Sequence, residues 1–425
     1  MNKITKIEGK YYNLSKFNHP GGDVALSHIF GRDSTILFKS YHQFTSNKIL
    51  SSIIKKYEIS KLPDNYKLLT KEENVPQFKF DTNFGLELKK EIANYFTQIS
   101  KEKNIHILES IKSPPERWLQ ILIMNIFRCL SFYQLLCGDK IGIFTYSISS
   151  WLCCANSFHD ACHFSLSRNK NINKFFSYTS PLFCPPLTWY HHHNIGHHSY
   201  TNIKNKDPDL YHNSYFKRTI QSTKYKKIYR YQHITLFIEW LLSYIGLVIQ
   251  PNIEVLNTSM YHNVIPSRYE KVSFLIESIY IFIGISLSFL PFALYDNIYD
   301  ASLLSFSPYI LHSLLFMINS QITHIHTHCM VEEIDWYKHQ VLTATNHSIG
   351  SKIAFIFSGG LNYQIEHHLF PNINHYHLSK IQPIVKKVCQ KHNVIYKEFN
   401  GYWDAFLSYF KHIKLMSYLN KKEVY

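Results

Sequence analysis

Long apolar runs predict the helices that dominate this chain. Trp118–Leu136 and Ile141–Phe158 are of membrane-spanning length and are joined by four residues that begin at Cys137, which predicts a helical hairpin. Val272–Leu294 and Ser302–Gln321 form a second pair, and the seven residues between them include neither Lys nor Arg. The pattern therefore predicts a mainly α membrane protein with four transmembrane helices in two hairpins.

Histidines gather in three short clusters beside these apolar runs. The clusters are HDACH at His159–His163, WYHHHNIGHHSYTN at Trp189–Asn202 and QIEHH at Gln364–His368. Neutral imidazole is the most common nitrogen ligand for iron, zinc and copper. The candidate metal ligands are His159, His163, His193, His197, His198, His324, His367 and His368. Their number exceeds the ligand set of a single zinc site and favours two metal ions.

Almost no carboxylate stands next to these histidines, which distinguishes the pattern from soluble di-iron bundles built on glutamate. The chain has 26 histidines, so chance clustering is the alternative for any one cluster. Three clusters, each beside an apolar run, are hard to explain as packing. The sequence therefore predicts a histidine-rich helical cap over the membrane helices.

Positive charges near the hairpins predict the orientation of the cap. They come from Lys112, Arg117, Arg168, Lys170, Lys174, Arg268 and Lys271. By the positive-inside rule, both termini and all three histidine clusters lie on the cytosolic side. Ile234–Ile249 is apolar but short and contains Glu239. If it crossed the bilayer it would separate the third cluster from the other two, so we expect it in the interface plane or only partway in. The proline-rich Phe175–Trp189 should also be interfacial.

Composition narrows the class of protein. Charged residues make up 18% of the chain, aromatic residues 16%, and the mean hydropathy is −0.18, a mixture that suggests membrane spans joined to soluble parts. Lys, Asn, Ile and Tyr are all abundant, so we interpret the net charge of +15 as coding bias, with a basic face toward anionic lipid and no nucleic-acid partner. The eight cysteines form no CxxC and should be reduced packing residues. The first residues lack an apolar stretch, so no secretory signal is expected.

Two histidines mark the N-terminal part. His19 lies in the turn His19-Pro20-Gly21-Gly22, and His42 follows GRDST at Gly31–Thr35. Two imidazoles on opposing edges can hold a haem iron from both faces, and such iron moves electrons without binding oxygen. HPGG followed by GRDST and a histidine resembles the cytochrome b5 haem-binding domain over about residues 7 to 60. The resemblance implies His19 and His42 as axial ligands of haem b.

The histidine clusters carry a second resemblance. HDxxH, HxxxHH and QxxHH resemble the boxes of membrane-bound fatty-acid desaturases, and the similarity covers about 350 residues. Gln364 at the start of the third box, together with a cytochrome b5 domain, resembles the front-end subclass, and GHHSYTN is similar to Δ5 acyl desaturases. The resemblance implies an O₂-dependent oxidoreductase with a di-iron centre that inserts a cis double bond into a polyunsaturated acyl chain. Gln364 would hydrogen-bond a metal-bound species or orient the site.

These expectations divide the chain and name its partners. We expect a haem-binding domain at 1–75, a linker at 76–113 with one amphipathic helix near Leu86–Ser100, a desaturase domain at 114–395 and an amphipathic tail at 396–425. The resemblance implies an acyl-lipid or acyl-CoA substrate, NADH-cytochrome b5 reductase as electron donor, and the endoplasmic reticulum membrane. The alternatives are a Δ6, Δ8 or sphingoid-base desaturase, a b5-fused lipid hydroxylase, and a haem membrane protein without catalysis.

Overall fold

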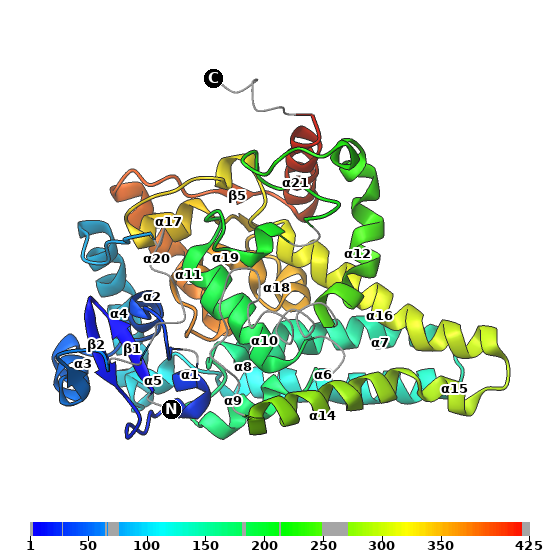
Figure 1. The fold of residues 1–425 in the computed structure, drawn as a ribbon, viewed down its shortest axis with the longest axis horizontal. Helices are drawn as coiled ribbons and strands as arrows, with labels where there is room; N and C mark the ends of the chain where they lie inside the picture. Colours follow the sequence, from blue (N-terminus) through cyan, green and yellow to red (C-terminus); the bar gives the residue numbers. More distant parts are fainter. Residues whose placement is uncertain are drawn as a thin grey trace.

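The computed structural model describes residues 3–27, 29–63, 66, 76–180, 184–211, 214–248 and 271–418. Three parts can be followed in Figure 1: a small N-terminal unit drawn in blue, a central cap of short helices, and an arm of long helices that extends away from the cap. The fold is mainly helical, as the apolar runs predict.

The N-terminal unit combines a small sheet with short helices. Its strands are β1 (Ile4–Ile7), β2 (Lys10–Asn13) and β3 (Glu58–Ile59), which pair antiparallel in the order β1-β2-β3. Its helices are α1 (Gly22–Ser27), α2 (Thr35–Tyr41) and α3 (Asn47–Ile54). Glu8 and Gly9 join β1 to β2 with positive φ at both residues, the backbone that a two-residue hairpin favours. Tyr12, Leu14 and Leu26 lie in the core of the unit.

The arm begins with the first expected hairpin. It consists of α6 (Pro115–Leu136) and α7 (Ile141–Cys153), which pack against each other. Gly138 lies in the connecting turn with φ +82°, which favours glycine. A side chain at Gly142 would come within 2.7 Å of the Leu135 backbone, so this glycine allows the two helices to cross closely.

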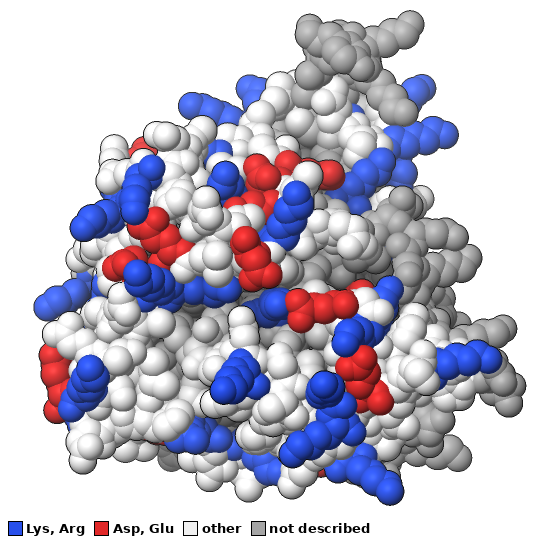
Figure 2. Space-filling view, turned by 90° about the vertical axis from the view of Figure 1, so that its left-hand side faces the viewer, with Lys and Arg blue, Asp and Glu red and all other residues white. Residues whose placement is uncertain are grey.

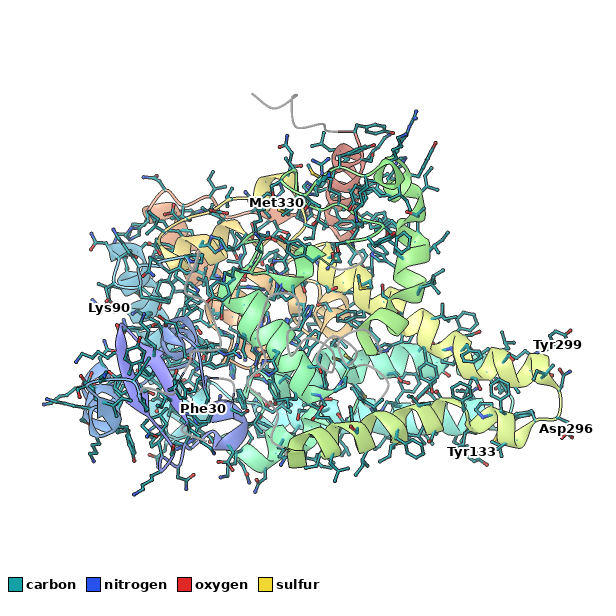
Figure 3. The ribbon with its side chains drawn as sticks, viewed as in Figure 1. Phe30, Lys90, Tyr133, Asp296, Tyr299 and Met330 are labelled. Carbon is teal, nitrogen blue, oxygen red and sulfur yellow. The ribbon has the colours of Figure 1, made fainter. Side chains whose placement is uncertain are left out.

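The second hairpin consists of α14 (Lys271–Ser288), α15 (Leu290–Leu294) and α16 (Ile298–Gln321). The helix expected over Val272–Leu294 is divided at Phe289, because Pro291 has no N–H to continue the helical hydrogen bonds. Figure 3 shows Asp296 and Tyr299 at the end of the arm that is farthest from the cap. The Tyr295 hydroxyl donates to a backbone carbonyl at the end of α6, so the tips of the two hairpins are connected.

Large apolar side chains are exposed along the arm. Leu122 and Ile126 on α6 and Phe282 on α14 are about half exposed or more. Such exposure suits contact with lipid better than contact with water. Among the described residues, Ile107–Leu136 and Ile298–Gln321 have the length and hydropathy of a membrane span. The helices α7 and α14 do not reach that length and hydropathy, so two of the four expected spans are supported.

The helix α12 (Gln232–Val248) packs against α16 and against α21 (Tyr402–Met416), the helix of the C-terminal segment. Trp240 and Tyr409 stack across the α12–α21 contact with their ring centres 5.5 Å apart. In Figure 1, α12 runs steeply across the direction of α16. Residues 249–270, which include the last residue of the expected interfacial segment, lie outside the described residues.

The cap has a core shared by four helices. They are α4 (Asn83–Lys103), α17 (Trp336–Leu342), α19 (Gln364–Leu369) and α20 (Leu378–Lys391). On α4, Phe84, Leu88, Ile92 and Phe96 are buried at intervals of four residues, which places them on one face of the helix. The helix expected near Leu86–Ser100 is therefore confirmed, and it packs onto the cap along this face.

The other elements are short. They are α5 (Ile107–Ser110), α8 (His159–Cys162), α9 (Lys170–Ser177), α10 (Pro186–Trp189), α11 (His198–Tyr200), α18 (Lys352–Ser358), β4 (Asn346–His347) and β5 (Glu398–Phe399), with short 3-10 or π-helical segments at Lys55–Tyr57, Cys154–Phe158, Tyr190–His197, Pro208–Tyr211, Lys227–Tyr231, Thr327–Cys329, Leu361–Tyr363 and His375–His377. Figure 2 shows Lys and Arg interspersed with Asp and Glu on the face that includes the N-terminal unit. The positive net charge is therefore not gathered into one uninterrupted patch on that face.

Candidate metal centre

Each histidine cluster lies on a short helical segment of the cap. The π-helical turn Cys154–Phe158 connects α7 to α8, and α8 begins at His159. A second π-helical turn, Tyr190–His197, leads into α11. π-helical turns are rare, occur frequently at functional sites and change the direction of the side chains that follow. The third cluster forms α19.

Four of the predicted ligands come together from all three clusters. These are His159, His163, His193 and His367, which we call cluster A; they are buried, and their candidate ligand atoms all lie within 4.8 Å of one another. Nε2 of His159 is 2.7 Å from Nε2 of His193. Two ring nitrogens that face each other at this distance could both bind the same metal ion.

Three further predicted ligands form a second group beside the first. These are His197, His324 and His368, which we call cluster B, and their candidate ligand atoms also lie within 4.8 Å of one another. His198 lies between the clusters: its Nε2 is 3.1 Å from Nε2 of His193, and its ring stacks on that of His368 with centres 4.2 Å apart. The structure therefore gathers all eight predicted histidines.

Gln364, predicted as a residue of the catalytic site, lies at cluster B. Its side-chain nitrogen is 2.8 Å from Nε2 of His324. The same residue lines a narrow cavity that reaches both clusters, since His159 and His324 line it as well. The other walls are mostly apolar and come from Trp151, Cys154, Ala155, Phe158, Trp189, Phe316 and Leu361, with Asn319 and Ser320 on α16.

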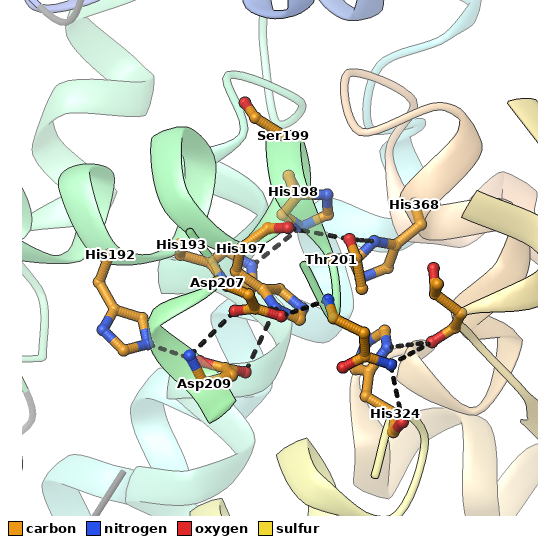
Figure 4. Close-up of polar contacts among 12 residues, drawn as sticks. His192, His193, His197, His198, Ser199, Thr201, Asp207, Asp209, His324 and His368 are labelled. Carbon is orange, nitrogen blue, oxygen red and sulfur yellow. Dashed lines mark hydrogen bonds and ion pairs between the residues drawn. The ribbon is translucent and has the colours of Figure 1, made fainter. Parts of the chain in front are cut away.

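The orientation of each imidazole in cluster B is fixed by a hydrogen bond at its Nδ1 atom, as Figure 4 shows in part. Nδ1 of His197 is 3.1 Å from the Asp207 carboxylate, and Nδ1 of His368 is 3.0 Å from the Gln340 side-chain oxygen. Nδ1 of His324 is 3.0 Å from a backbone carbonyl. Because Nδ1 donates in each case, Nε2 is the atom left to bind a metal ion, and at His324 the metal ion would replace the hydrogen bond that Nε2 accepts from the Gln364 amide.

His367 in cluster A is fixed by a chain of hydrogen bonds. Its Nδ1 is 3.1 Å from Nε2 of His375, and Nδ1 of His375 donates to the Gly359 carbonyl. Nδ1 of His375 also lies 3.2 Å from the carboxylate of Asp160, which forms a fully buried ion pair with Arg117 at 3.3 Å. His375 therefore accepts at Nε2 from His367, which leaves Nε2 of His367 free to bind a metal ion.

Unpartnered ring nitrogens test whether metal ions fit these clusters. The buried Nε2 atoms of His163, His367 and His368 have no hydrogen-bond partner among the described residues. A buried polar atom without a partner costs free energy. A metal ion at each cluster would provide the missing partner, so the side chains fit a centre of two metal ions.

Burial keeps most of these imidazoles neutral. It lowers the pKa of all members of cluster A and of His198 and His368 well below the usual value, and the neighbouring imidazoles act in the same direction. His197 is different: burial lowers its pKa, but Asp209 and Asp207 outweigh burial and raise the pKa to about 9. A metal ion bound at Nε2 of His197 therefore displaces a proton.

The sequence did not reveal the carboxylates of this centre. The expectation that almost no carboxylate accompanies the histidines is wrong for the surrounding layer, where Asp160, Asp207 and Asp209 contact histidine side chains. Asp207 and Asp209 follow the second cluster within NKDPDL, a signal that was present in the sequence. The sequence also gives no indication that His375 contacts His367.

His326 and His328 form a stacked pair of their own. The Nε2 atom of His326 donates to the Ile322 carbonyl, and its ring stacks on that of His328 with centres 5.2 Å apart. Neither belongs to cluster A or cluster B. His377 donates to the Lys112 carbonyl.

The two predicted haem ligands face each other in the N-terminal unit. The rings of His19 and His42 are perpendicular, with centres 5.8 Å apart. Two imidazole–metal bonds of about 2.0 Å each, with the distance from nitrogen to ring centre added, give roughly 6 Å. Nδ1 of His42 donates to the Phe38 carbonyl, which leaves its Nε2 for iron. Nδ1 of His19 instead accepts from the Gly21 amide, so haem binding requires His19 to give up this bond.

Comparison with known proteins identifies the family. The fatty acid desaturase family model matches residues 141–400, and the model for the cytochrome b5-like heme/steroid binding domain matches residues 4–63. The chain belongs to the fatty acid desaturase family. The desaturase is thus an oxidoreductase of lipid metabolism that carries a cytochrome b5-like domain at its N-terminal end. The predicted family, enzyme class and domain combination are confirmed.

Curated relatives match the desaturase along nearly its whole length. A probable Delta(5) fatty acid desaturase C of Dictyostelium discoideum is 29% identical over 99% of this chain and 92% of the relative. An acyl-lipid (8-3)-desaturase of Mortierella alpina is 27% identical over 98% and 94% of the two chains. A Delta(8)-fatty-acid desaturase 2 of Arabidopsis thaliana is 24% identical over 94% and 86%. No solved structure is significantly similar to the desaturase.

Proposed function

We propose that the desaturase inserts a cis double bond at the Δ5 position of C20 polyunsaturated acyl chains, with two iron ions as its metal centre. The observation that carries the desaturase activity is the apolar cavity that reaches both histidine clusters, and the Δ5 position is taken from the name of the Dictyostelium relative. An acyl chain that enters the cavity would bring its methylene groups beside both metal positions.

Imidazole ligands suit iron as well as zinc and copper, and we propose iron in both positions because the reaction requires O₂ activation. Cluster A would hold one ion and cluster B the other, with His198 between them. Bound iron supplies the activation of O₂ that removal of hydrogen from an unactivated methylene group requires. The residues of the chain hold the imidazoles in one orientation through Asp207, Gln340 and His375. Gln364 would orient the site next to His324 through its side-chain amide.

The cavity wall has a second role in this function. Phe158, Trp189 and Phe316 exclude water from the metal positions and provide apolar contact for an acyl chain. Asn319 and Ser320 are the polar exceptions on α16. Exclusion of water protects reactive species from side reactions and keeps the acyl chain in one orientation.

Electrons reach the metal centre, in this proposal, through haem b held by His19 and His42. The haem would be reduced by NADH-cytochrome b5 reductase.

We propose the endoplasmic reticulum membrane as the location, with the cap and both termini in the cytosol. The exposed apolar residues of α6 and α14 support membrane insertion of the arm. The helix α12 runs across the direction of α16, so with α16 inserted in the bilayer α12 would lie along the membrane interface. Cysteine-accessibility mapping that placed His163 and His368 on different sides would contradict this topology.

The domain limits are also part of the proposal. The cytochrome b5-like domain extends over 1–75, the connecting segment over 76–113, the desaturase domain over 114–395 and the C-terminal segment over 396–425. Packing of α4 against α17 and α20 supports a connecting segment that is an ordered part of the cap.

Expression in yeast tests the activity. We expect cells fed with C18 and C20 polyunsaturated acids to convert the C20 acid to a product with a new double bond, at the Δ5 position that the name of the Dictyostelium relative gives. A new Δ8 bond would favour the activity named for the Arabidopsis relative. A hydroxylated product without a new double bond would contradict the proposal. Replacement of His197 by Ala is the inactive control.

A further inference from the structure

A short segment of the N-terminal unit contacts the cap beside the metal centre. We call Tyr41–Phe44, at the end of α2, the docking segment. The side-chain amide of Gln43 donates to the Leu369 carbonyl at 2.8 Å, and Leu369 directly follows the third histidine cluster. The ring of Phe44 packs edge-on against Phe96 of α4 with centres 5.8 Å apart. These contacts hold the docking segment on the cap.

Tyr41 makes the most direct contact between the two parts. Its hydroxyl oxygen lies 3.0 Å from Nδ1 of His163, a member of cluster A. The Asn372 side chain donates to the Tyr41 carbonyl at 3.0 Å, which fixes the backbone at this point. The next residue in the chain is His42, a candidate haem ligand. A candidate haem ligand and a candidate iron ligand are therefore separated by one tyrosine.

We propose that Tyr41 couples the cytochrome b5-like domain to the metal centre: its hydroxyl holds His163, and the route His42–Tyr41–His163 carries electrons from haem to iron. This inference rests on the proposed function, since it requires both groups to be bound. It assigns Tyr41 as a positioning residue for His163 and as part of the electron route.

The chemistry of the contact agrees with both roles. When Nε2 of His163 binds iron, its Nδ1 carries the proton and donates to the Tyr41 oxygen. This hydrogen bond fixes the orientation and tautomer of the His163 ring. Electron transfer weakens steeply with distance, and covalent bonds and hydrogen bonds transmit it better than open gaps. In each transfer one ferrous haem iron is oxidised to ferric and one ferric iron of the metal centre is reduced to ferrous. Tyr41 stays a neutral phenol, and no proton needs to leave it.

The test uses the full-length protein loaded with haem and iron. Under anaerobic conditions the haem is reduced with limiting dithionite, and the loss of the ferrous haem absorbance band reports transfer to the metal centre. Tyr41→Phe keeps the ring and removes only the hydroxyl. Tyr11→Phe on β2, in the same unit, is the matched control. Gln43→Ala is a second variant that removes one docking contact and keeps the tyrosine bridge.

We expect Tyr41→Phe to slow the loss of ferrous haem roughly tenfold, the lower end of the loss in activity that follows removal of a hydrogen-bond partner of a metal-bound histidine. It should also alter the electron paramagnetic resonance spectrum of the metal centre, while hydrogen exchange in β1 and β2 stays as in the unaltered protein. Tyr11→Phe should change neither property, and Gln43→Ala should slow transfer less than Tyr41→Phe.

The possible failures are distinguishable. Unchanged transfer and an unchanged spectrum in Tyr41→Phe would overturn the role of Tyr41 and leave the proposed function intact. Equal slowing by Gln43→Ala would show that docking alone sets the rate, which would also overturn the route. If the unaltered protein passes no electron from haem to the metal centre, the proposed function itself fails.

Discussion

Nε2 of His375 accepts a hydrogen bond from Nδ1 of His367 at 3.1 Å and so fixes the orientation of the His367 ring. His375 is in turn fixed by the Gly359 carbonyl and lies beside Asp160 of the first histidine cluster. The first and third clusters are therefore connected through a residue that binds no metal ion itself.

Replacement of His375 by Ala should weaken metal binding at cluster A. Loss of the hydrogen-bond partner of a metal-binding histidine lowers metal affinity by roughly 10- to 100-fold, because the histidine ring is no longer held in one orientation and tautomer. The measurement is the iron content of the purified protein after dialysis against a weak chelator. His377→Gln is the matched control, since His377 lies two residues away and donates to the Lys112 carbonyl instead. Equal iron retention in both variants would contradict the role of His375.

Replacement of Asp207 by Ala should affect cluster B selectively. Asp207 and Asp209 together hold His197, and loss of the Asp207 carboxylate removes an acceptor at 3.1 Å from Nδ1. We expect a loss of affinity of roughly 10- to 100-fold for one metal ion, with the other retained. The iron content per chain should fall toward one while X-ray absorption still shows imidazole ligation. Loss of both ions together would indicate that the two clusters do not bind independently.

Arg117 should be important for stability because its partner is buried. Both side chains of the Arg117–Asp160 pair are fully buried, and Arg117 also donates to Asn156. Removal of one partner leaves a buried charge without compensation, which costs about 3–5 kcal/mol. Arg117→Met should therefore lower the temperature of thermal unfolding in detergent. Lys386→Met removes an exposed pair with Glu398 and should change that temperature little. Equal shifts would contradict the importance of burial.

The cavity can be narrowed without touching a ligand. Ser320 lines the cavity on α16, and Ser320→Phe would fill part of the space proposed for the acyl chain. Displacement of a substrate by about 1 Å can slow a reaction by roughly 100-fold. We expect a loss of that order in product formation with unchanged iron content. Ser302→Phe, on the same helix outside the cavity, is the control. Full activity of Ser320→Phe would place the acyl chain elsewhere.

Local patterns in the sequence were sufficient for much of this fold. The apolar run at Trp118–Leu136 predicts α6, and the interval of four residues between His159 and His163 predicts a shared helix face. The second hairpin was also recognised from its apolar runs, although the break at Pro291 moved its boundaries. These features depend on neighbours in the chain, which a single sequence displays directly.

The contacts between distant segments could not be predicted in the same way. Tyr41 meets His163 across more than a hundred residues, and Asp160 meets His375 across more than two hundred. No periodic pattern in the sequence predicts contacts between residues so far apart in the chain, because these contacts depend on how the cap packs against the arm. The histidines themselves could be selected only because metal binding concentrates one residue type in short motifs. Their outer partners belong to several residue types and have no such motif.

The most direct test of the two-metal centre is the iron content of the purified full-length protein, with haem iron determined separately and subtracted. Iron loaded at saturation should reach two equivalents per chain besides haem. His159→Ala in cluster A and His324→Ala in cluster B should each bind close to one equivalent. One equivalent or less in the unaltered protein, after full loading, would contradict the account.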